Sequence, residues 1–311
     1  MMRRSKQRVK RRGLILFTVF LVLFFLFFPK TVSAGAKEGL ALWFYTVMPA
    51  LLPFMIISGF MMKERITEPL NRLIGPFLSR LFAIPYRCAY PVVIGFLSGF
   101  PVGAKVTGQM YFNQEITREE AEYLLSFCNN ASPMFLISYI GVECLHLRMP
   151  VEIFIFIVFS AWIQSFYTRK KYHMHSEPFP GSVFRKKNSA FSGKGAALKQ
   201  VSRPGVVEAL DESIMDSFLT ITKIGGYILL FSILIQMIQD FIPIDHSLKY
   251  IGIGFLEITT GGKVFSGISL APWLKYGIFV GLCAFGGISS IFQTASVIRE
   301  TGLSVKGYVF S

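Results

Sequence analysis

The chain has 311 residues, of which 52% are hydrophobic and only 16% are charged, and its mean hydropathy is +0.52. Soluble domains carry about 25% charged residues, so this composition excludes an ordinary soluble enzyme, a disordered chain and a disulfide scaffold and indicates an all-α polytopic membrane protein. The net charge of +14 is concentrated in residues 1–12, with seven Lys/Arg and no acid, and in residues 169–203, with nine Lys/Arg and one Glu. Both segments adjoin apolar runs, as cytoplasmic flanks do, and neither has the interleaved aromatic residues of a nucleic-acid surface. We therefore expect the lipid bilayer as a partner, no nucleic acid, and a cytoplasmic N-terminus.

Three features follow the basic head in chain order. The apolar run 14–28 is expected to be a signal anchor, with a cleaved signal peptide as the alternative. The run 40–62 is uncharged and long enough to span a hydrocarbon core of ~30 Å. Residues 63–87 place apolar side chains at helical spacing among Lys and Arg, which predicts an amphipathic arm at the cytoplasmic interface.

The next apolar segment, residues 89–112, is interrupted by glycines, a proline and a lysine within GFLSGFPVGAK. Such breaks occur at membrane depth where backbone lines a cavity. The run 123–144 is interrupted in turn by CNNASP, and the run 150–167 is continuous. If all three runs crossed the membrane, the basic segment after residue 168 would lie outside, against the positive-inside rule. We therefore expect residues 89–112 to form a re-entrant hairpin that enters from the cytoplasm.

The second half contains a continuous run at 218–241, a broken run at 247–267 around LEITTGG, and a run at 276–298 interrupted by Phe-Gly-Gly. The span before the first broken segment is expected to run inward and that before the second outward. This arrangement predicts an inverted-topology repeat with two broken or re-entrant glycine-rich helical hairpins, in which Gly95 aligns with Gly281. The predicted organisation is as follows: a basic head and first span at 1–37, a first membrane repeat at 38–168, a basic cytoplasmic linker at 169–213, and a second repeat at 214–311. The second repeat lacks counterparts of the last two helices of the first, so we expect a carboxyl-terminal truncation or a fold completed by another chain, such as a homo-oligomer.

Polar residues inside the broken runs are the candidate site. Lys105 is expected either to contact an anion beside a half-helix start or to extend to the membrane interface. Glu257 is expected either to couple transport to a proton or cation or to pair with Lys263 or Lys249. Asn129, Asn130 and Ser132 precede a proline and can cap a half-helix that faces the solute. The remaining candidates are Ser98, Gly99, Pro101, Gly103, Thr259, Thr260, Gly261, Lys263, Gly286, Gly287, Ser289 and Gln293.

Residue patterns of enzymes and metal proteins are missing from the sequence. The four cysteines show neither CxxC nor Cys/His ligand spacing, and no Ser/His/Asp set or phosphate-binding loop is present. The sequence therefore predicts no catalysis, no metal and no cofactor.

Four motifs resemble, in order, those of the YlbJ family of sporulation integral membrane proteins: GFLSGFPVGAK from Gly95, CNNASP from Cys128, LEITTGG from Leu256 and AFGG from Ala284. That family is related to the Gate-domain proteins of nucleoside recognition, and the resemblance covers about residues 38–311. It implies an endospore-forming bacterium and a protein that moves dipicolinate, a small aromatic dicarboxylate, from the mother cell across the outer forespore membrane. The alternatives are a structural or assembly protein of the spore envelope and a transporter of nucleoside-type solutes. The broken helices favour a transporter or channel for a small anion, in the cell membrane or the outer forespore membrane.

Overall fold

The computed structural model describes residues 2–64, 66–172, 174, 205–242 and 247–309. Of these residues 84% are helical and none forms a β-strand, as an all-α membrane protein requires. The basic linker predicted at 169–213 lies largely outside the described residues.

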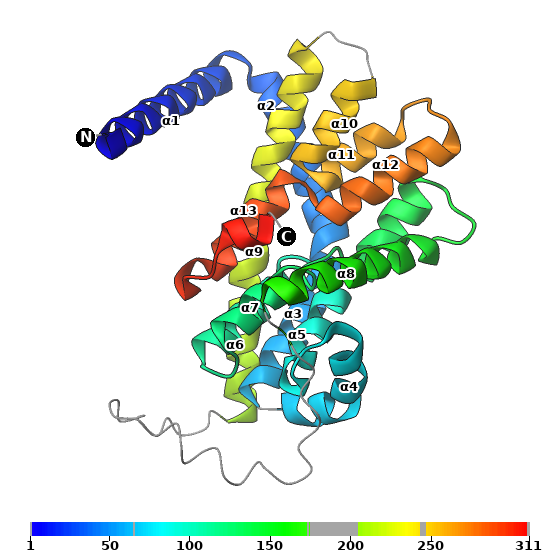
Figure 1. Cartoon of the computed structure of the whole chain (residues 1–311). Coiled ribbons are helices and arrows are strands. Elements are labelled where there is room, and N and C mark those ends of the chain that lie inside the picture. The colour runs from blue at the N-terminus through cyan, green and yellow to red at the C-terminus, as the bar shows by residue number, and fades with distance from the viewer. Residues whose placement is uncertain (1, 65, 173, 175–204, 243–246, 310–311) are drawn as a thin grey trace.

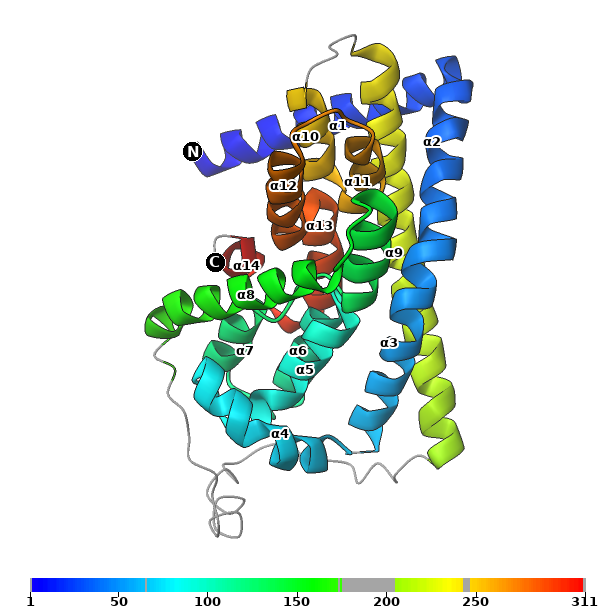
Figure 2. The same ribbon diagram turned by 90° about the vertical axis from the view of Figure 1, so that its right-hand side faces the viewer.

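Two long helices side by side form the spine of the molecule (Figures 1 and 2). The first is a continuous 35-residue helix made of α2 (Pro29–Leu42), a π-helical turn η1 (Trp43–Val47) and α3 (Met48–Lys63). The second is α9 (Val206–Phe241), of 36 residues. Small residues allow the close approach, because a Cβ atom at Gly39 would lie 2.7 Å from Ser232 Oγ. At 1.5 Å per residue each helix is long enough to cross a ~30 Å hydrocarbon core and extend beyond it.

The first helix of the spine begins earlier than its apolar run, at Pro29 and not near residue 40. Proline is favoured at the first helical position because it lacks an N–H group that would be unpaired there. Helix α1 (Met2–Phe27) ends two residues before Pro29 and projects sideways from the spine (Figure 1). Its last turn rests on α9 through the rings of Phe24 and Phe241, whose centroids are 5.4 Å apart.

The interfacial arm and the first broken segment follow. They comprise α4 (Thr67–Phe82), η2 (Tyr86–Cys88), α5 (Ala89–Ser98) and α6 (Val102–Phe112). The chain bends by 100° between α4 and the η2–α5 pair, after Ala83 in a left-handed conformation. Helices α5 and α6 pack side by side with almost no space between them, since a Cβ atom at Gly103 would lie 2.8 Å from the Cα atom of Gly95.

The first half ends with α7 (Arg118–Leu125), the π-helix η3 (Phe135–Cys144) and α8 (Val151–Lys171). Thr117 and Glu120 form a capping box at the start of α7, and the Glu120 carboxylate also accepts a hydrogen bond from Arg87 at 2.6 Å. The Cys-Asn-Asn-Ala-Ser stretch between α7 and η3 is non-helical, and the helix resumes at Pro133. Helix α8 lies across the spine in both views (Figures 1 and 2), so α8 and α9 are not both perpendicular to one bilayer plane.

The second half repeats the use of short, paired helices. Its elements are α10 (Ser247–Leu256), α11 (Ile258–Ser266), α12 (Pro272–Phe285), α13 (Gly287–Ile298), η5 (Arg299–Thr301) and α14 (Val305–Val309). Helices α10 and α11 pack together through Gly254 and Gly261. The alignment of Gly95 with Gly281 is not reflected in their packing: Gly95 lies against the carbonyl of Cys128, whereas a Cβ atom at Gly281 would meet nothing within 4 Å.

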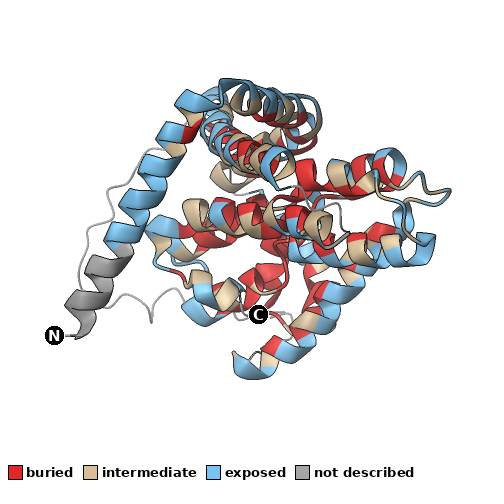
Figure 3. Ribbon diagram, turned by 90° about the horizontal axis from the view of Figure 1, so that it is seen from above, coloured by how far each residue is buried: buried red, intermediate tan, exposed pale blue. Residues whose placement is uncertain are grey.

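Four of the described helices are long and apolar enough to cross a membrane, or five if the bent pair α4 and η2–α5 counts as one span. The four are Pro29–Lys63, Val151–Lys171, Val206–Phe241 and Pro272–Thr301. Buried residues line the inward faces of the bundle and exposed residues its outside (Figure 3), where Phe156, Phe159 and Leu230 are each about half exposed. Exposed apolar side chains of this size are normal against lipid and costly in water. The chain is a multi-pass helical membrane protein.

Candidate functional site

The breaks in four helical segments are set by the residues that interrupt them. Gly286 and Gly287 have φ angles of +77° and +83°, which residues with a Cβ atom rarely adopt. They separate α12 from α13. Glu257 is extended between α10 and α11, and Gly99 has φ of +81° between α5 and α6. The fourth break is the non-helical stretch before η3.

These four breaks meet at one place. The backbone N–H of Phe100 donates to the carbonyl oxygen of Asn130 at 2.6 Å, and a Cβ atom at Gly99 would lie 2.5 Å from the backbone nitrogen of Ser132. On the other side, Gly286 faces the ring of Phe100, and Gly287 faces the backbone of Glu257, each at 3.3–3.4 Å from a hypothetical Cβ atom. Because the Tyr139 hydroxyl on η3 also donates to the carbonyl oxygen of Thr259 on α11 at 2.7 Å, the four interrupted segments form a closed ring of contacts.

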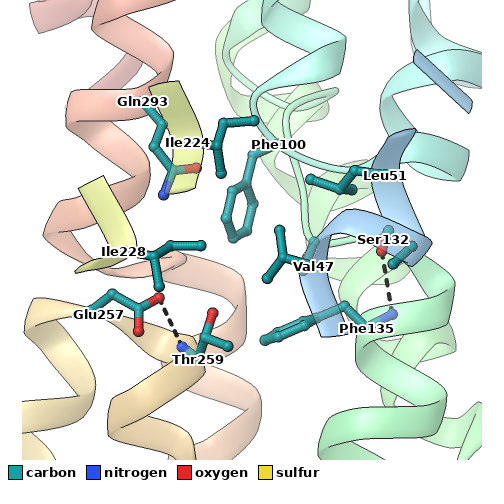
Figure 4. Close-up of a pocket in the computed structure, with 12 residues that line it drawn as sticks. Val47, Leu51, Phe100, Ser132, Phe135, Ile224, Ile228, Glu257, Thr259 and Gln293 are labelled. Carbon is teal, nitrogen blue, oxygen red and sulfur yellow. Dashed lines mark hydrogen bonds between the residues drawn. The ribbon is translucent and has the colours of Figure 1, made fainter. Parts of the chain in front are cut away.

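A cavity of about 30 Å³ lies inside this ring, against the spine (Figure 4). It has room for about two water molecules. Its lining residues are Val47, Ala50, Leu51, Phe100, Ala131, Ser132, Phe135, Ile224, Ile228, Glu257, Thr259 and Gln293. Both long helices, the Phe100 tip, the break before η3, η3, α11 and α13 thus contribute to one partly open space.

The polar groups of the cavity are anchored at helix starts. The Glu257 side chain is 2% exposed, and its two oxygens accept hydrogen bonds from the backbone N–H groups of Thr259 and Thr260 at 2.9 and 2.6 Å. It is thereby the N-cap of α11. The Ser132 hydroxyl accepts from the N–H of Phe135 at 3.2 Å at the start of η3. On α13 the carboxamide of Gln293 donates to Ser289 Oγ at 3.1 Å.

Helix starts dominate the electrostatics of this place. Helices α6, η3, α11 and α13 all begin at the ring of contacts, and each start carries a partial positive charge from its first N–H groups. At the start of α6 the N–H of Ala104 donates to Asn129 Oδ1 at 3.3 Å. The start of α11 is already occupied by the Glu257 carboxylate. The start of α13 follows Gly286, which has no side chain to cap it. The site therefore combines one fixed carboxylate with several N–H dipoles, and its lining contains no basic side chain.

The structure brings some predicted site residues together and separates others. Ser132, Glu257, Thr259 and Gln293 line the cavity. The tip and break residues Ser98, Gly99, Pro101, Gly103, Gly286, Gly287 and Ser289 lie beside it. Thr260 hydrogen bonds Ser232 on α9 at 2.6 Å, and Gly261 packs on Gly254. Asn129 and Asn130 face a second cavity, on the far side of their break.

Both candidate lysines point away from the cavity. Lys105 Nζ donates to Thr220 Oγ1 on α9 at 2.8 Å and lies 3.4 Å from the Asp216 carboxylate. Lys263 pairs with Glu38 at 2.6 Å on the exposed surface. The alternative in which Glu257 pairs with Lys263 or Lys249 is therefore wrong, since Lys249 donates to carbonyl oxygens at the end of α9. Within the described residues no three His, Cys, Asp or Glu side chains gather as metal ligands would.

The apolar lining residues were missed at the sequence level. Val47, Ala50 and Leu51 follow an i, i+3, i+4 pattern on the first spine helix, and Ile224 and Ile228 an i, i+4 pattern on α9. Such patterns mark a helix face but do not tell whether it faces lipid or a cavity. Phe100 could have been found, since it is the aromatic residue between the glycine and proline of the first break.

The fold and the site define a multi-pass helical membrane protein with a partly polar cavity where interrupted helices meet. Residues 44–165, from η1 to α8, match the family model described as Gate, nucleoside recognition. Over 325 aligned residues the chain is 27% identical to the sporulation integral membrane protein YlbJ of Bacillus subtilis (strain 168), covering 94% of this chain and 78% of that protein. The resemblance to the YlbJ family predicted from the four motifs is confirmed. No solved structure is significantly similar to the chain.

Proposed function

We propose that this protein is a transporter that binds a small solute in the cavity where its interrupted helices meet. The observation that carries the proposal is the convergence of four helix breaks on one cavity beside the two longest apolar helices. Non-helical backbone at membrane depth is tolerated where it lines a cavity or is covered by protein. A protein with a purely structural role needs neither such breaks nor a carboxylate buried at their meeting point.

Each half of the chain supplies similar parts to this site. The first half provides α3, the α5–α6 pair and the α7–η3 break, and the second provides α9, the α10–α11 pair and the α12–α13 break. Helices α5 and α6 have 10 and 11 residues, so each is only about 15 Å long and is too short to cross alone. We propose that residues 89–112 enter the membrane and return, and that the halves form an inverted repeat around the site, as in many secondary transporters.

We propose dipicolinate as the first solute to test, because YlbJ is named a sporulation protein and because helix starts favour carboxylates. The start of α11 already holds one carboxylate, that of Glu257. The uncapped start of α13 is available for another. The Glu257 charge opposes a dianion, so a dicarboxylate needs the helix starts to outweigh that repulsion.

A nucleoside-type solute is the second candidate. The Gate model is described as nucleoside recognition, and a neutral solute meets no repulsion from Glu257. Its hydroxyl groups would donate to the carboxylate, while the Gln293 carboxamide and the rings of Phe100 and Phe135 suit a planar base. With either solute the cavity must enlarge, since about 30 Å³ holds only water.

The test is uptake of radiolabelled dipicolinate and, separately, uridine into proteoliposomes that contain the full chain. We expect one of them to be taken up faster than into empty vesicles. Gln293→Leu should weaken its apparent affinity by about 2- to 10-fold, the effect of one lost hydrogen bond. Lys263→Gln is the matched control and should leave uptake unchanged, since Lys263 pairs with Glu38 outside the site. Uptake equal to that of empty vesicles for both solutes would favour the structural role.

A further inference from the structure

A second and larger cavity lies on the other side of the break before η3. Its volume is about 220 Å³, enough for a cluster of water molecules or a small solute. The wall is formed by the end of α7 and the residues after it, one face of α8, the α12–α13 break and α14. Its polar lining residues are Ser126, Asn129, Asn130, Ser160, Gln164 and Tyr308.

Consecutive residues of the same segments line the two cavities. In the break before η3, Asn130 lines the large cavity, and the next residues, Ala131 and Ser132, line the small one. In the last break Phe285 lines the large cavity, and the following Gly286 touches the ring of Phe100, which lines the small one. The tip residue Phe100 and the two breaks therefore lie between the two cavities.

Helix α8 provides independent support for a wet, polar cavity. Its sequence is largely Phe, Ile, Val and Trp, as expected of a helix against lipid. Ser160 and Gln164, which are four residues apart on one face, nevertheless both line the cavity. The Ser160 hydroxyl and the Gln164 carboxamide hydrogen bond no other described side chain. Polar side chains in membrane helices are costly unless they face a cavity or a partner, so these two groups are free to bind a solute or water.

We propose that the large cavity is a second solute-binding site, from which the solute passes to the small cavity when the Phe100 tip separates from the two breaks. The proposal rests on the proposed function, because the two sites serve the same solute. The lining has carboxamides, hydroxyls and the ring of Phe285 but no charged side chain. It therefore takes a small planar solute through hydrogen bonds and ring contact.

The test places a single new thiol in the large cavity. Ser160→Cys is treated in proteoliposomes with a membrane-impermeant, positively charged methanethiosulfonate reagent. The four native cysteines are buried, so the unmodified protein provides the background rate. Ile163→Cys is the matched control, because Ile163 lies on the same helix, is 44% exposed and does not line the cavity.

We expect Ser160→Cys to react about tenfold faster than Ile163→Cys, because thiolates form in water and not in lipid. Saturating dipicolinate or uridine, whichever the protein binds, should slow the reaction several-fold, and the modified protein should lose uptake. Equal reaction rates at the two positions, or no protection by either solute, would overturn the second site whatever the uptake result. Protection without uptake would support the second site and contradict the proposed transport function. Uptake without protection would support transport and contradict the second site.

Phe100→Ala provides a second measurement of the barrier. Removing the ring joins the two cavities, so solute leak through the loaded vesicles should increase while Ser160→Cys modification continues to be slowed by the solute. An unchanged leak in a folded Phe100→Ala protein would contradict the assignment of Phe100 as the barrier.

Discussion

Replacement of Glu257 tests the central feature of the site. The carboxylate satisfies two backbone N–H groups, those of Thr259 and Thr260, and both residues are only 4% exposed. Glu257→Ala leaves both donors without an acceptor, at a cost of about 1–3 kcal/mol each, so we expect a loss of about 2–6 kcal/mol in total. Glu257→Gln keeps one acceptor oxygen and should lose about half as much.

These losses correspond to measurable shifts in unfolding temperature. For a chain of this length about 2 °C per kcal/mol is expected, which gives roughly 4–12 °C for Glu257→Ala and roughly 2–6 °C for Glu257→Gln. A thiol-reactive fluorescent dye reports unfolding directly, because all four cysteines are buried in the folded protein. Glu300→Gln, at an exposed position on η5, is the control and should unfold as the unmodified protein does.

The critical result is which of the two variants, Glu257→Ala or Glu257→Gln, unfolds at the lower temperature. If Glu257→Ala and Glu257→Gln unfold at the same reduced temperature, the charge and not the N-cap is responsible. If neither differs from the unmodified protein, Glu257 does not hold the start of α11, and the electrostatic description of the cavity is wrong.

Two further predictions concern the first hairpin. Lys105→Gln and Asp216→Asn should each lower stability by no more than about 1 kcal/mol, because Asp216 is 45% exposed. The double variant should lose less stability than the sum of the two single losses. Full additivity in thermal unfolding would show that the two residues do not interact. Gly95→Ala should abolish folding or transport, because the new methyl group would overlap the carbonyl oxygen of Cys128. The control Gly277→Ala should be neutral or slightly stabilising, because a Cβ atom there meets nothing within 4 Å. Equal unfolding temperatures for the two alanine variants would refute the close packing of the hairpin.

The sequence located the breaks because glycine, proline and asparagine interrupt otherwise apolar runs. The interruptions at Gly99, Ser132, Glu257 and Gly286 all coincide with ends of helices. These residues are informative because their backbone preferences act locally and need no knowledge of the fold. The class of protein, a multi-pass helical membrane protein, was likewise predicted without knowledge of the fold, from the amino-acid composition.

The lining of the cavity could not be found by the same reasoning. Val47 and Ile224 differ in no way from lipid-facing residues until the two long helices are placed side by side. Lys105 was a candidate for contact with an anion or with the membrane interface because it lies in a break, but its long side chain reaches Asp216 on a helix more than a hundred residues further along the chain. The alignment of Gly95 with Gly281 did not predict how the two glycines pack. It matched them by their spacing in the sequence, whereas the role of a glycine depends on what packs against it.

The N-cap formed by Glu257 has a consequence for the protein in its empty state. A carboxylate tethered to the chain acts at a high effective concentration on the helix start beside it, so a dilute inorganic ion such as chloride competes poorly for those N–H groups. A solute would need several simultaneous contacts with the cavity to exchange with this internal ligand. Selectivity against small anions would then arise from competition within the chain, without any dedicated filter.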